Sequence, residues 1–268
     1  MIVKINDFQH SLLFDEMLDI CRKIPDTGRY AVTLGGSFGK GLSDINSDYD
    51  FRIYYDTRVQ EEHWNRIMTE LDECIQRWDE IGIKIDGIWA RNISQTNDAL
   101  DEWLGGKGQP EVHVWCVWGY HILTDIFNQV ILEDPYGVAM VWKERLGVYP
   151  ASLRNHLIAK HASSLRYWRS DYHYKSKVVR EDTVFLASIT ARLVHDMMQI
   201  LYALNGAYYP GDGMNLAYAK HFTVLPESFS ERINTILYPY SSTGVFLVQY
   251  ENLIKLIDDI LTLIPDNT

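Results

Sequence analysis

The spacing of apolar residues predicts that helices and strands alternate in the first half of the chain. Apolar positions recur at helical spacing over residues 13–24 and again over 64–78. Short apolar or alternating runs at 30–34, 49–55 and 83–89 predict three strands between and after these helices. The order helix, strand, strand, helix, strand is typical of a sheet with helices packed on it.

The second half of the chain reads as helical. Apolar stripes over 153–168 and 245–264 predict long amphipathic helices. Residues 184–204 are apolar around most of the helix circumference, which predicts a central buried helix. The run 112–118 stays ambiguous between a strand and the start of a buried helix.

Turn signals separate the two halves. Asp134-Pro135-Tyr136-Gly137 is a strong turn sequence, and Pro150 is another break. We therefore predict an α/β domain over residues 1–140 and an all-α helical bundle over 141–268, which is an α+β fold class overall.

A glycine turn follows the first predicted strand. Gly35 and Gly36 allow backbone angles that other residues avoid, and they let a ligand approach the main chain closely. Together with the Ser37 hydroxyl, the N–H groups of such a turn can bind an anion. The spacing matches neither a P-loop nor a dinucleotide-binding fingerprint. Taken alone, the three residues fit a purely structural tight turn equally well.

Two carboxylates follow on the next strand. Because side chains alternate along a strand, Asp48 and Asp50 point to one face, while the other face is apolar throughout. We expect a half-buried strand whose adjacent like charges need a cation to offset them. Mg²⁺ prefers such oxygen ligands and often joins one or two carboxylates to substrate phosphates. An exposed acidic strand edge is the alternative.

Composition narrows the class of partner. The chain has 268 residues with 25 Lys+Arg and 36 Asp+Glu, a formal net charge of −11. Such a surface repels phosphate backbones, so nucleic acid is an unlikely main partner. Three separated cysteines, no signal-peptide pattern and no run of about 20 apolar residues favour the cytoplasm, with no membrane segment.

The two motifs together resemble a known signature. Gly35-Gly36-Ser37, a spacer of ten residues and Asp48-x-Asp50 are similar to the signature of the nucleotidyltransferase superfamily related to DNA polymerase β. The order of predicted elements resembles the minimal core of that superfamily. An α/β part followed by helices is similar to its small-molecule branch, such as the aminoglycoside and lincosamide nucleotidyltransferases. The whole chain looks most like the DUF4037-type members.

The resemblance implies a nucleotidyltransferase fold and a third carboxylate that completes the metal site and acts as general base. Asp86, on the predicted strand 83–89, is our leading candidate, and Glu111 is the rival. The resemblance also implies Mg²⁺ and a nucleoside triphosphate, with ATP favoured, held by Gly35, Gly36 and Ser37. From a basic segment of the helical part, Lys160 and Lys175 are candidates to complete the phosphate clamp.

A polar stripe interrupts the apolar helix 184–204. Arg192, His195, Asp196 and Gln199 follow helical spacing on one face. Two interpretations remain open: the stripe contacts the acceptor substrate, or it forms an internal hydrogen-bond network. Cysteine spacing gives no support for zinc.

We therefore expect an Mg²⁺-dependent transferase that moves a nucleoside monophosphate, AMP from ATP, onto a hydroxyl of a small molecule. One alternative is a nucleotide-binding regulatory protein with a degenerate site. Another is a toxin-like enzyme acting on a protein or tRNA. The sequence allows a monomer or a homodimer. It does not identify the acceptor molecule, because function depends on the residues of the site and not on the fold.

Overall fold

The computed structural model describes residues 7–114, 116–211, 213, 215–240 and 244–265. Contacts divide the chain into two compact units. Unit 1 comprises Met1–Asp101 and Ile122–Val148, and unit 2 comprises Glu102–His121 and Tyr149–Thr268. The predicted division at residue 140 cuts the chain once, whereas these units exchange chain at three points.

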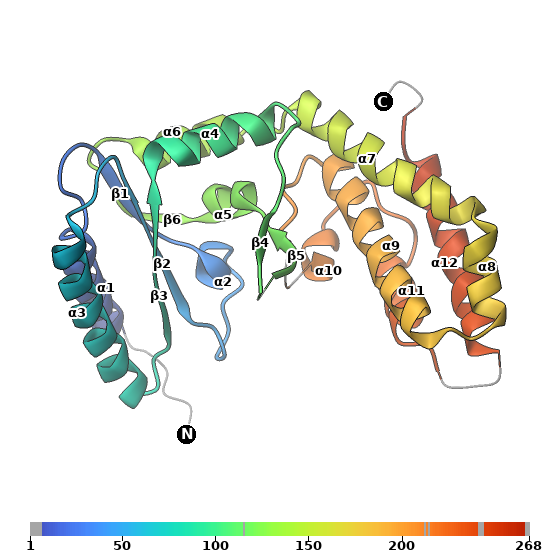
Figure 1. The fold of residues 1–268 in the computed structure, drawn as a ribbon, viewed down its shortest axis with the longest axis horizontal. Coiled ribbons are helices and arrows are strands. Elements are labelled where there is room, and N and C mark those ends of the chain that lie inside the picture. Colours follow the sequence, from blue (N-terminus) through green and yellow to red (C-terminus); the bar gives the residue numbers. More distant parts are fainter. Residues whose placement is uncertain (1–6, 115, 212, 214, 241–243, 266–268) are drawn as a thin grey trace. The chain divides into compact units, whose positions relative to one another are not determined.

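Unit 1 is built on a mixed sheet (Figure 1). Its strands are β1 (Tyr30–Leu34), β2 (Tyr49–Tyr55), β3 (Ile85–Asn92) and β6 (Val130–Glu133). The strand order is β3-β2-β1-β6, with β1 antiparallel to both β2 and β6 and with β2 parallel to β3. The three predicted strands are confirmed. The sheet has a fourth strand, β6, which the sequence analysis did not predict because it is only four residues long.

Helices cover both faces of this sheet. They are α1 (Asp7–Cys21), the short α2 (Gly36–Gly39), α3 (Glu61–Glu80), α4 (Ile93–Leu104), α5 (Ile122–Asn128) and α6 (Val138–Leu146). The helices α1 and α3 lie together on one face (Figure 1), where Leu13, Met17 and Leu71 pack on the apolar side of the strands. The sheet flanked by helices confirms the predicted fold class for this part.

The second face of β2 is buried as well, which corrects the expectation of a half-buried strand. Arg52 is only 6% exposed and Tyr54 is fully buried. The Tyr54 hydroxyl donates to Gln129 Oε1 at 3.0 Å, and the Thr33 hydroxyl donates to the same oxygen at 2.7 Å. Polar side chains on this face are therefore matched by polar partners from α5 and the residue after it, so an alternating pattern did not mark a solvated face.

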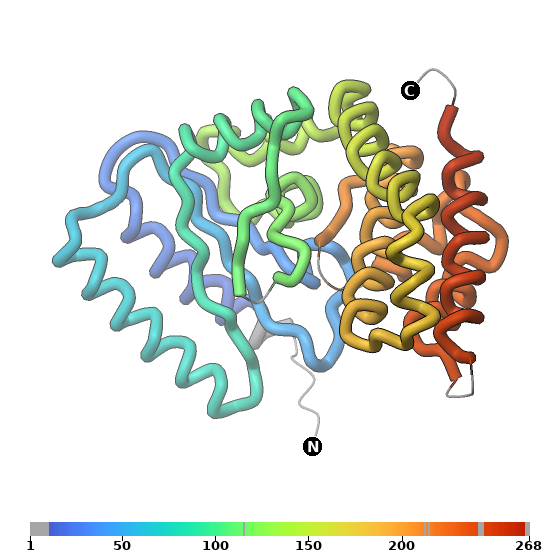
Figure 2. Tube along the Cα trace, turned by 45° about the vertical axis from the view of Figure 1, so that its right-hand side comes forward, coloured from blue at the N-terminus to red at the C-terminus, as the bar shows by residue number. Residues whose placement is uncertain are grey.

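Unit 2 is a helical bundle with a small hairpin. Its helices are α7 (Ala151–Ser170), α8 (Tyr172–Val179), α9 (Thr183–Leu204), α10 (Asn215–Ala219), α11 (Phe229–Leu237) and α12 (Val245–Thr262). The helices α7, α9 and α12 lie side by side (Figures 1 and 2), and their buried apolar residues form one core with α8 and α11. The predicted helical second part is confirmed.

The ambiguous run at 112–118 falls in the hairpin. It contains β4 (Glu111–His113) and the start of β5 (Cys116–Tyr120), which pair antiparallel. Val112 and Val117 are 93% and 84% exposed. The run is therefore neither one strand nor the start of a buried helix, because a turn divides it.

Helix α9 is the central helix that the sequence predicts. It is long and apolar enough to cross a membrane by length and composition alone, yet 61% of its apolar window is buried inside the structure. Leu193, Met197 and Leu201 are fully buried in the core of unit 2. The core helix of a soluble protein passes the same test of composition, and the burial fits that explanation.

Candidate functional site

The glycine turn begins where β1 ends. The N–H of Gly35 donates to the main-chain oxygen of Asp50 at 2.8 Å, which ties the turn to β2. Gly36 then adopts a left-handed φ of +55° and opens the short helix α2. Glycine tolerates this angle at no steric cost, so the sequence places it where the chain reverses direction.

The side chain of Asp50 packs directly on this turn. A Cβ atom added to Gly36 would overlap the Asp50 Oδ2 and crowd its Cγ at 2.5 Å. The carboxylate therefore occupies the space that any other residue at position 36 would fill. The structure thus brings the glycine turn and the second acid of the pair into contact.

The third predicted acid lies on the neighbouring strand. Because β2 and β3 run parallel with Tyr49 opposite Ile85, Asp86 lies at the same end of the sheet as Asp48 and Asp50. Asp86 is exposed, and Asp48 is partly buried. Glu111 belongs to β4 in unit 2, where its carboxylate lies 3.4 Å from His113 Nε2. Asp86, unlike Glu111, thus lies in unit 1 at the end of the sheet where the pair lies.

Electrostatics couple these three acids. The pKa of Asp50 is raised to about 6: burial is the largest cause, the Arg52 guanidinium opposes it, and the negative charges of Asp48, Asp86 and Asp125 add to it. Burial and the charge of Asp48 also raise the pKa of Asp86. In both cases burial is the larger cause and the neighbouring acids add to it, so a bound cation would stabilise the charged forms.

Sequence reasoning missed a buried ion pair behind the turn. Arg52 Nε donates to Asp125 Oδ2 at 3.0 Å, and the side chains of both residues are 7% exposed. A second guanidinium nitrogen lies 3.5 Å from Asp50 Oδ1. Arg52 was visible on the acidic face of β2, but Asp125 lies 73 residues away on α5. No local pattern could have joined them.

The donors of the turn fit a phosphate. Ser37 Oγ is buried and has no hydrogen-bond partner among the residues that the structure describes. Leaving a buried hydroxyl without a hydrogen bond costs about 1–3 kcal/mol, so a group that accepts a hydrogen bond from Ser37 would be stabilising. A nucleotide phosphate beside Gly36 would supply such an acceptor.

The donor set also fits a hard cation, but only in part. No group of three or more His, Cys, Asp or Glu side chains within the described ranges is arranged to hold a metal ion. The oxygens of Asp48 and Asp50 remain suitable as two ligands, and Mg²⁺ commonly takes one or two carboxylates while phosphates and water complete its shell. The site therefore fits Mg²⁺ that arrives with a nucleotide.

The two predicted lysines lie in unit 2, on different helices. Lys160, on α7, lies with Nζ 3.3 Å from Gln109 Oε1. Lys175 is exposed on α8, in a groove beside Tyr172. The structure does not bring these two lysines together, and their role in phosphate binding stays a prediction.

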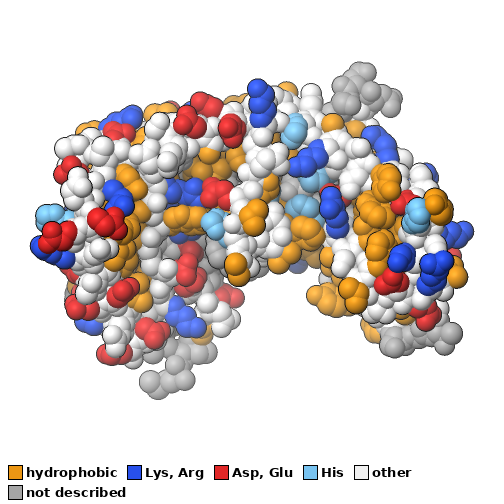
Figure 3. Space-filling model, in the orientation of Figure 1, with side chains coloured by type: hydrophobic (Ala, Val, Ile, Leu, Met, Phe, Trp, Pro, Cys, Tyr) orange, Lys and Arg blue, Asp and Glu red, His pale blue; other side chains and the backbone are white. Residues whose placement is uncertain are grey.

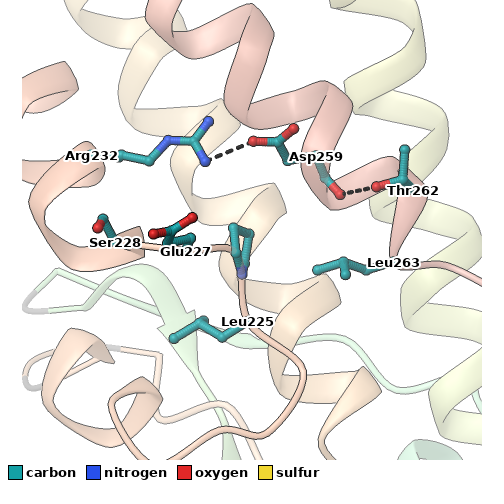
Figure 4. Close-up of a pocket in the computed structure, with 8 residues that line it drawn as sticks. Leu225, Glu227, Ser228, Arg232, Asp259, Thr262 and Leu263 are labelled. Carbon is teal, nitrogen blue, oxygen red and sulfur yellow. Dashed lines mark hydrogen bonds and ion pairs between the residues drawn. The ribbon is translucent and has the colours of Figure 1, made fainter.

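Another groove of unit 2 carries an ion pair of its own. Arg232 lies 2.7 Å from Asp259 at its wall, next to Leu225 and Thr262 (Figure 4). None of its lining residues belongs to the predicted site. On the face shown in Figure 3, acidic side chains are spread out and form no single patch.

The polar stripe on α9 forms an internal network at Asp196. The Asp196 carboxylate is bonded to His161 Nδ1 at 2.6 Å and accepts from the Ser164 hydroxyl at 2.7 Å. His195 stacks on Trp118, with ring centroids 4.3 Å apart and planes at 13°. Burial lowers the pKa of His195 to about 4, so its ring is neutral at pH 7. For Asp196, the structure favours the network interpretation.

We expect Asp196→Ala to lower the free energy of unfolding by about 1–3 kcal/mol, because it leaves His161 and Ser164 without their shared acceptor. Chemical denaturation of the intact chain measures this. Asp258→Ala is the control, since its ion pair with Arg169 is exposed and such pairs contribute at most about 1 kcal/mol. Equal losses in the two variants would contradict a special role for the buried network.

Comparison with protein families agrees with this geometry. A nucleotidyltransferase domain matches residues 15–121, and a domain of unknown function, DUF4037, matches residues 115–213. No curated protein matches the chain. The first match contains the glycine turn together with Asp48, Asp50 and Asp86, and it supports a nucleotidyl-transfer activity in general terms. Residues 15–121 therefore carry a nucleotidyltransferase domain, and residues 115–213 match the DUF4037 family.

Proposed function

We propose that this protein is an Mg²⁺-dependent enzyme that transfers a nucleoside monophosphate, AMP from ATP, to a hydroxyl of a small molecule. The observation that carries the proposal is the contact between the glycine turn and Asp50, with Asp48 and Asp86 at the same end of the sheet. Phosphate donors and paired carboxylates are thus held side by side by the backbone. This arrangement serves phosphoryl chemistry through positioning and electrostatics.

Each residue then has a distinct task. The turn N–H groups and Ser37 Oγ donate to phosphate oxygens, and Asp48 with Asp50 binds the cation. Asp86 takes the proton of the attacking hydroxyl, a role for which its raised pKa suits it. Bound Mg²⁺ would supply positive charge to the triphosphate and to the departing pyrophosphate.

The net charge of −11 supports a small or cationic acceptor over a nucleic acid. A hydroxylated, amine-bearing molecule such as an aminoglycoside combines both features. The proposal thus includes ATP as the nucleotide donor, Mg²⁺ as the cation and the cytoplasm as the compartment.

A second candidate is a nucleotide-binding regulatory protein without turnover. It is favoured by the absence, among the residues the structure describes, of three acids arranged as a ready metal site. The two functions predict the same binding of Mg²⁺-nucleotide and differ only in pyrophosphate release.

We expect the wild-type chain to release pyrophosphate when Mg²⁺, labelled nucleoside triphosphates and a panel of hydroxylated acceptors are combined. Asp48→Asn is expected to slow this release by at least about 10²-fold, because it removes one charged ligand of the cation. Asp44→Asn is the matched control, since Asp44 is an exposed carboxylate of the same loop. Product analysis of the labelled acceptor identifies the transferred group.

Nucleotide binding without pyrophosphate release across the whole panel would favour the regulatory protein. Release that is equal in wild type and Asp48→Asn would exclude this site as the source of activity. Including tRNA among the acceptors tests the toxin-like alternative directly.

A further inference from the structure

We propose that Asp125 and Arg52 are positioning residues, in which Asp125 holds the Arg52 guanidinium off Asp50 so that Asp50 stays available to a cation. The proposal rests on the proposed function, because it deepens the role of the same carboxylate. Neither residue is assigned a contact with substrate. Both act through Asp50.

The distances rank the contacts of Arg52 with two carboxylates, and a further guanidinium nitrogen donates to the main-chain oxygen of Phe51 at 3.3 Å. Its Nε–Asp125 Oδ2 distance is 3.0 Å, which is a normal charge-assisted hydrogen bond. The Arg52 nitrogen nearest to Asp50 Oδ1 lies at 3.5 Å, at the outer limit of hydrogen bonding. The guanidinium is therefore committed to Asp125 and only loosely associated with Asp50.

Burial fixes this arrangement. Both side chains of the Arg52–Asp125 pair are 7% exposed, so removing either partner would leave a buried charge that water cannot readily solvate. The Arg52 Cζ atom also lies 5.2 Å from the centre of the Trp89 ring, within the range of a cation–π contact. The guanidinium is thus held on two sides without the help of Asp50.

The same pair supports the glycine turn. A Cβ atom added to Gly35 would lie 2.7 Å from Asp125 Oδ1 and 3.2 Å from Arg52 Cζ. Gly35 therefore packs on the ion pair, as Gly36 packs on Asp50. Any movement of Arg52 toward Asp50 would disturb the turn and the carboxylate at once.

The 3.5 Å separation between the Arg52 guanidinium and the Asp50 carboxylate affects how Asp50 can bind a cation. A guanidinium bonded firmly to Asp50 would compete with a divalent cation for the same oxygens. Without any positive charge nearby, three acids of unit 1 would repel one another more strongly. The Arg52 guanidinium, 3.5 Å from Asp50 Oδ1, offsets part of that repulsion without forming a close hydrogen bond to the carboxylate. Since replacing a buried ion pair by apolar residues often stabilises a protein, stability alone gives weak grounds for keeping it.

Three variants of the intact chain test this arrangement: Asp125→Asn, Arg52→Gln and the double variant. Mn²⁺ binding, measured by electron paramagnetic resonance with and without ATP, is the first readout. Asp125→Asn releases Arg52 to bond Asp50, so we expect Mn²⁺ affinity to fall about tenfold. In the double variant no guanidinium competes, and we expect affinity to return to within about threefold of wild type. Arg52→Gln alone is expected to bind Mn²⁺ at least as tightly as wild type.

Hydrogen exchange at residues 34–42 is the second readout, and it needs no metal. We expect faster exchange in Asp125→Asn than in wild type. Unit 1 offers a matched control at the opposite end of β1 and β2, where Arg29 bonds Asp56 under the positive-φ Gly28. Asp56→Asn and Arg29→Gln should change neither Mn²⁺ affinity nor exchange at the turn. Circular dichroism verifies that every variant is folded.

A double variant as weak as Asp125→Asn would overturn the proposal, because a purely structural pair gives no rescue. So would a tenfold loss in Arg52→Gln, or unchanged affinity and exchange in Asp125→Asn. If wild type binds no Mn²⁺ under either condition, the proposed function fails at its metal site. The exchange readout then tests separately whether the ion pair supports the glycine turn: faster exchange in Asp125→Asn supports that contact, and unchanged exchange rejects it.

Discussion

Asp50→Asn is expected to abolish nucleotidyl transfer and, at pH 8, to make the chain more stable. The loss of activity should be at least about 10³-fold, since the variant lacks a charged ligand where metal-assisted stabilisation amounts to several kcal/mol. The gain in stability follows from burial. Asn keeps the shape of a neutral carboxylic acid, and burial raises the pKa of Asp50 to about 6 because the charged form is disfavoured there.

The sign of the pH dependence follows from linkage. The folded-state pKa lies above the unfolded value of 3.8, so the folded chain binds more protons between these values. The contribution of Asp50 is fully present below pH 3.8 and is lost as the pH rises through about 6. At pH 8 the charged form therefore costs on the order of 1–3 kcal/mol, and Asp50→Asn removes that cost. Urea denaturation of both chains at pH 8 and pH 4 measures the difference, which should vanish at the lower pH.

Asp56→Asn provides a control of opposite sign. Hydrogen bonds from Arg29 lower the pKa of Asp56, so its charged form is favoured in the folded chain. That variant should be destabilised at pH 8. If Asp50→Asn were also destabilised at pH 8, the buried carboxylate would not be the strained group that its pKa indicates.

Gly36→Ala is expected to lower the transfer rate by about 10²-fold or more while the chain remains folded. The alanine Cβ would occupy the position of Asp50 Oδ2, so the carboxylate must rotate away from the turn. Displacements of about 1 Å in a reacting group commonly cost that much in rate. Steady-state pyrophosphate release, compared with wild type at saturating ATP, measures the loss.

Gly41→Ala separates strain from crowding. Gly41 has a φ of +66°, close to the +55° of Gly36, but an added Cβ meets no atom within 4 Å. Both variants therefore pay the same left-handed backbone cost, about 1–2 kcal/mol. Only Gly36→Ala displaces a carboxylate. Similar losses of rate in the two variants would show that backbone conformation, and not the contact with Asp50, governs the activity.

The sequence predicted the parts of the fold that have a local cause. The strands that flank the glycine turn show two-residue alternation or a continuous apolar run, and α9 is a long segment that is apolar around most of the helix. Each of these patterns can be recognised without knowing which elements pack against the segment. The glycine pair and the Asp48–Asp50 pair lie within 16 residues of one another and belong to one signature.

What the sequence did not predict depends on contacts distant along the chain. The strand β6 has only four residues, and its pairing with β1 depends on residues about a hundred positions apart. The partner of Arg52 is also remote, because Asp125 lies 73 residues away and no local pattern joins the two. Burial of a polar side chain is decided by whether a partner arrives, and periodicity carries no information on that.

The division of unit 1 into two stretches has a consequence for synthesis of the protein. When residues up to Asp101 have left the ribosome, β1 still lacks β6 on one side, and Arg52 still lacks Asp125. The nascent sheet then presents an open edge, which is a template for wrong pairing with other chains. The α5–β6 stretch pairs with β1 at that edge and brings Asp125 to the buried arginine in the same step. Completion of the sheet and completion of the acidic site are therefore one event during translation, and a chain stalled before residue 133 should require a chaperone.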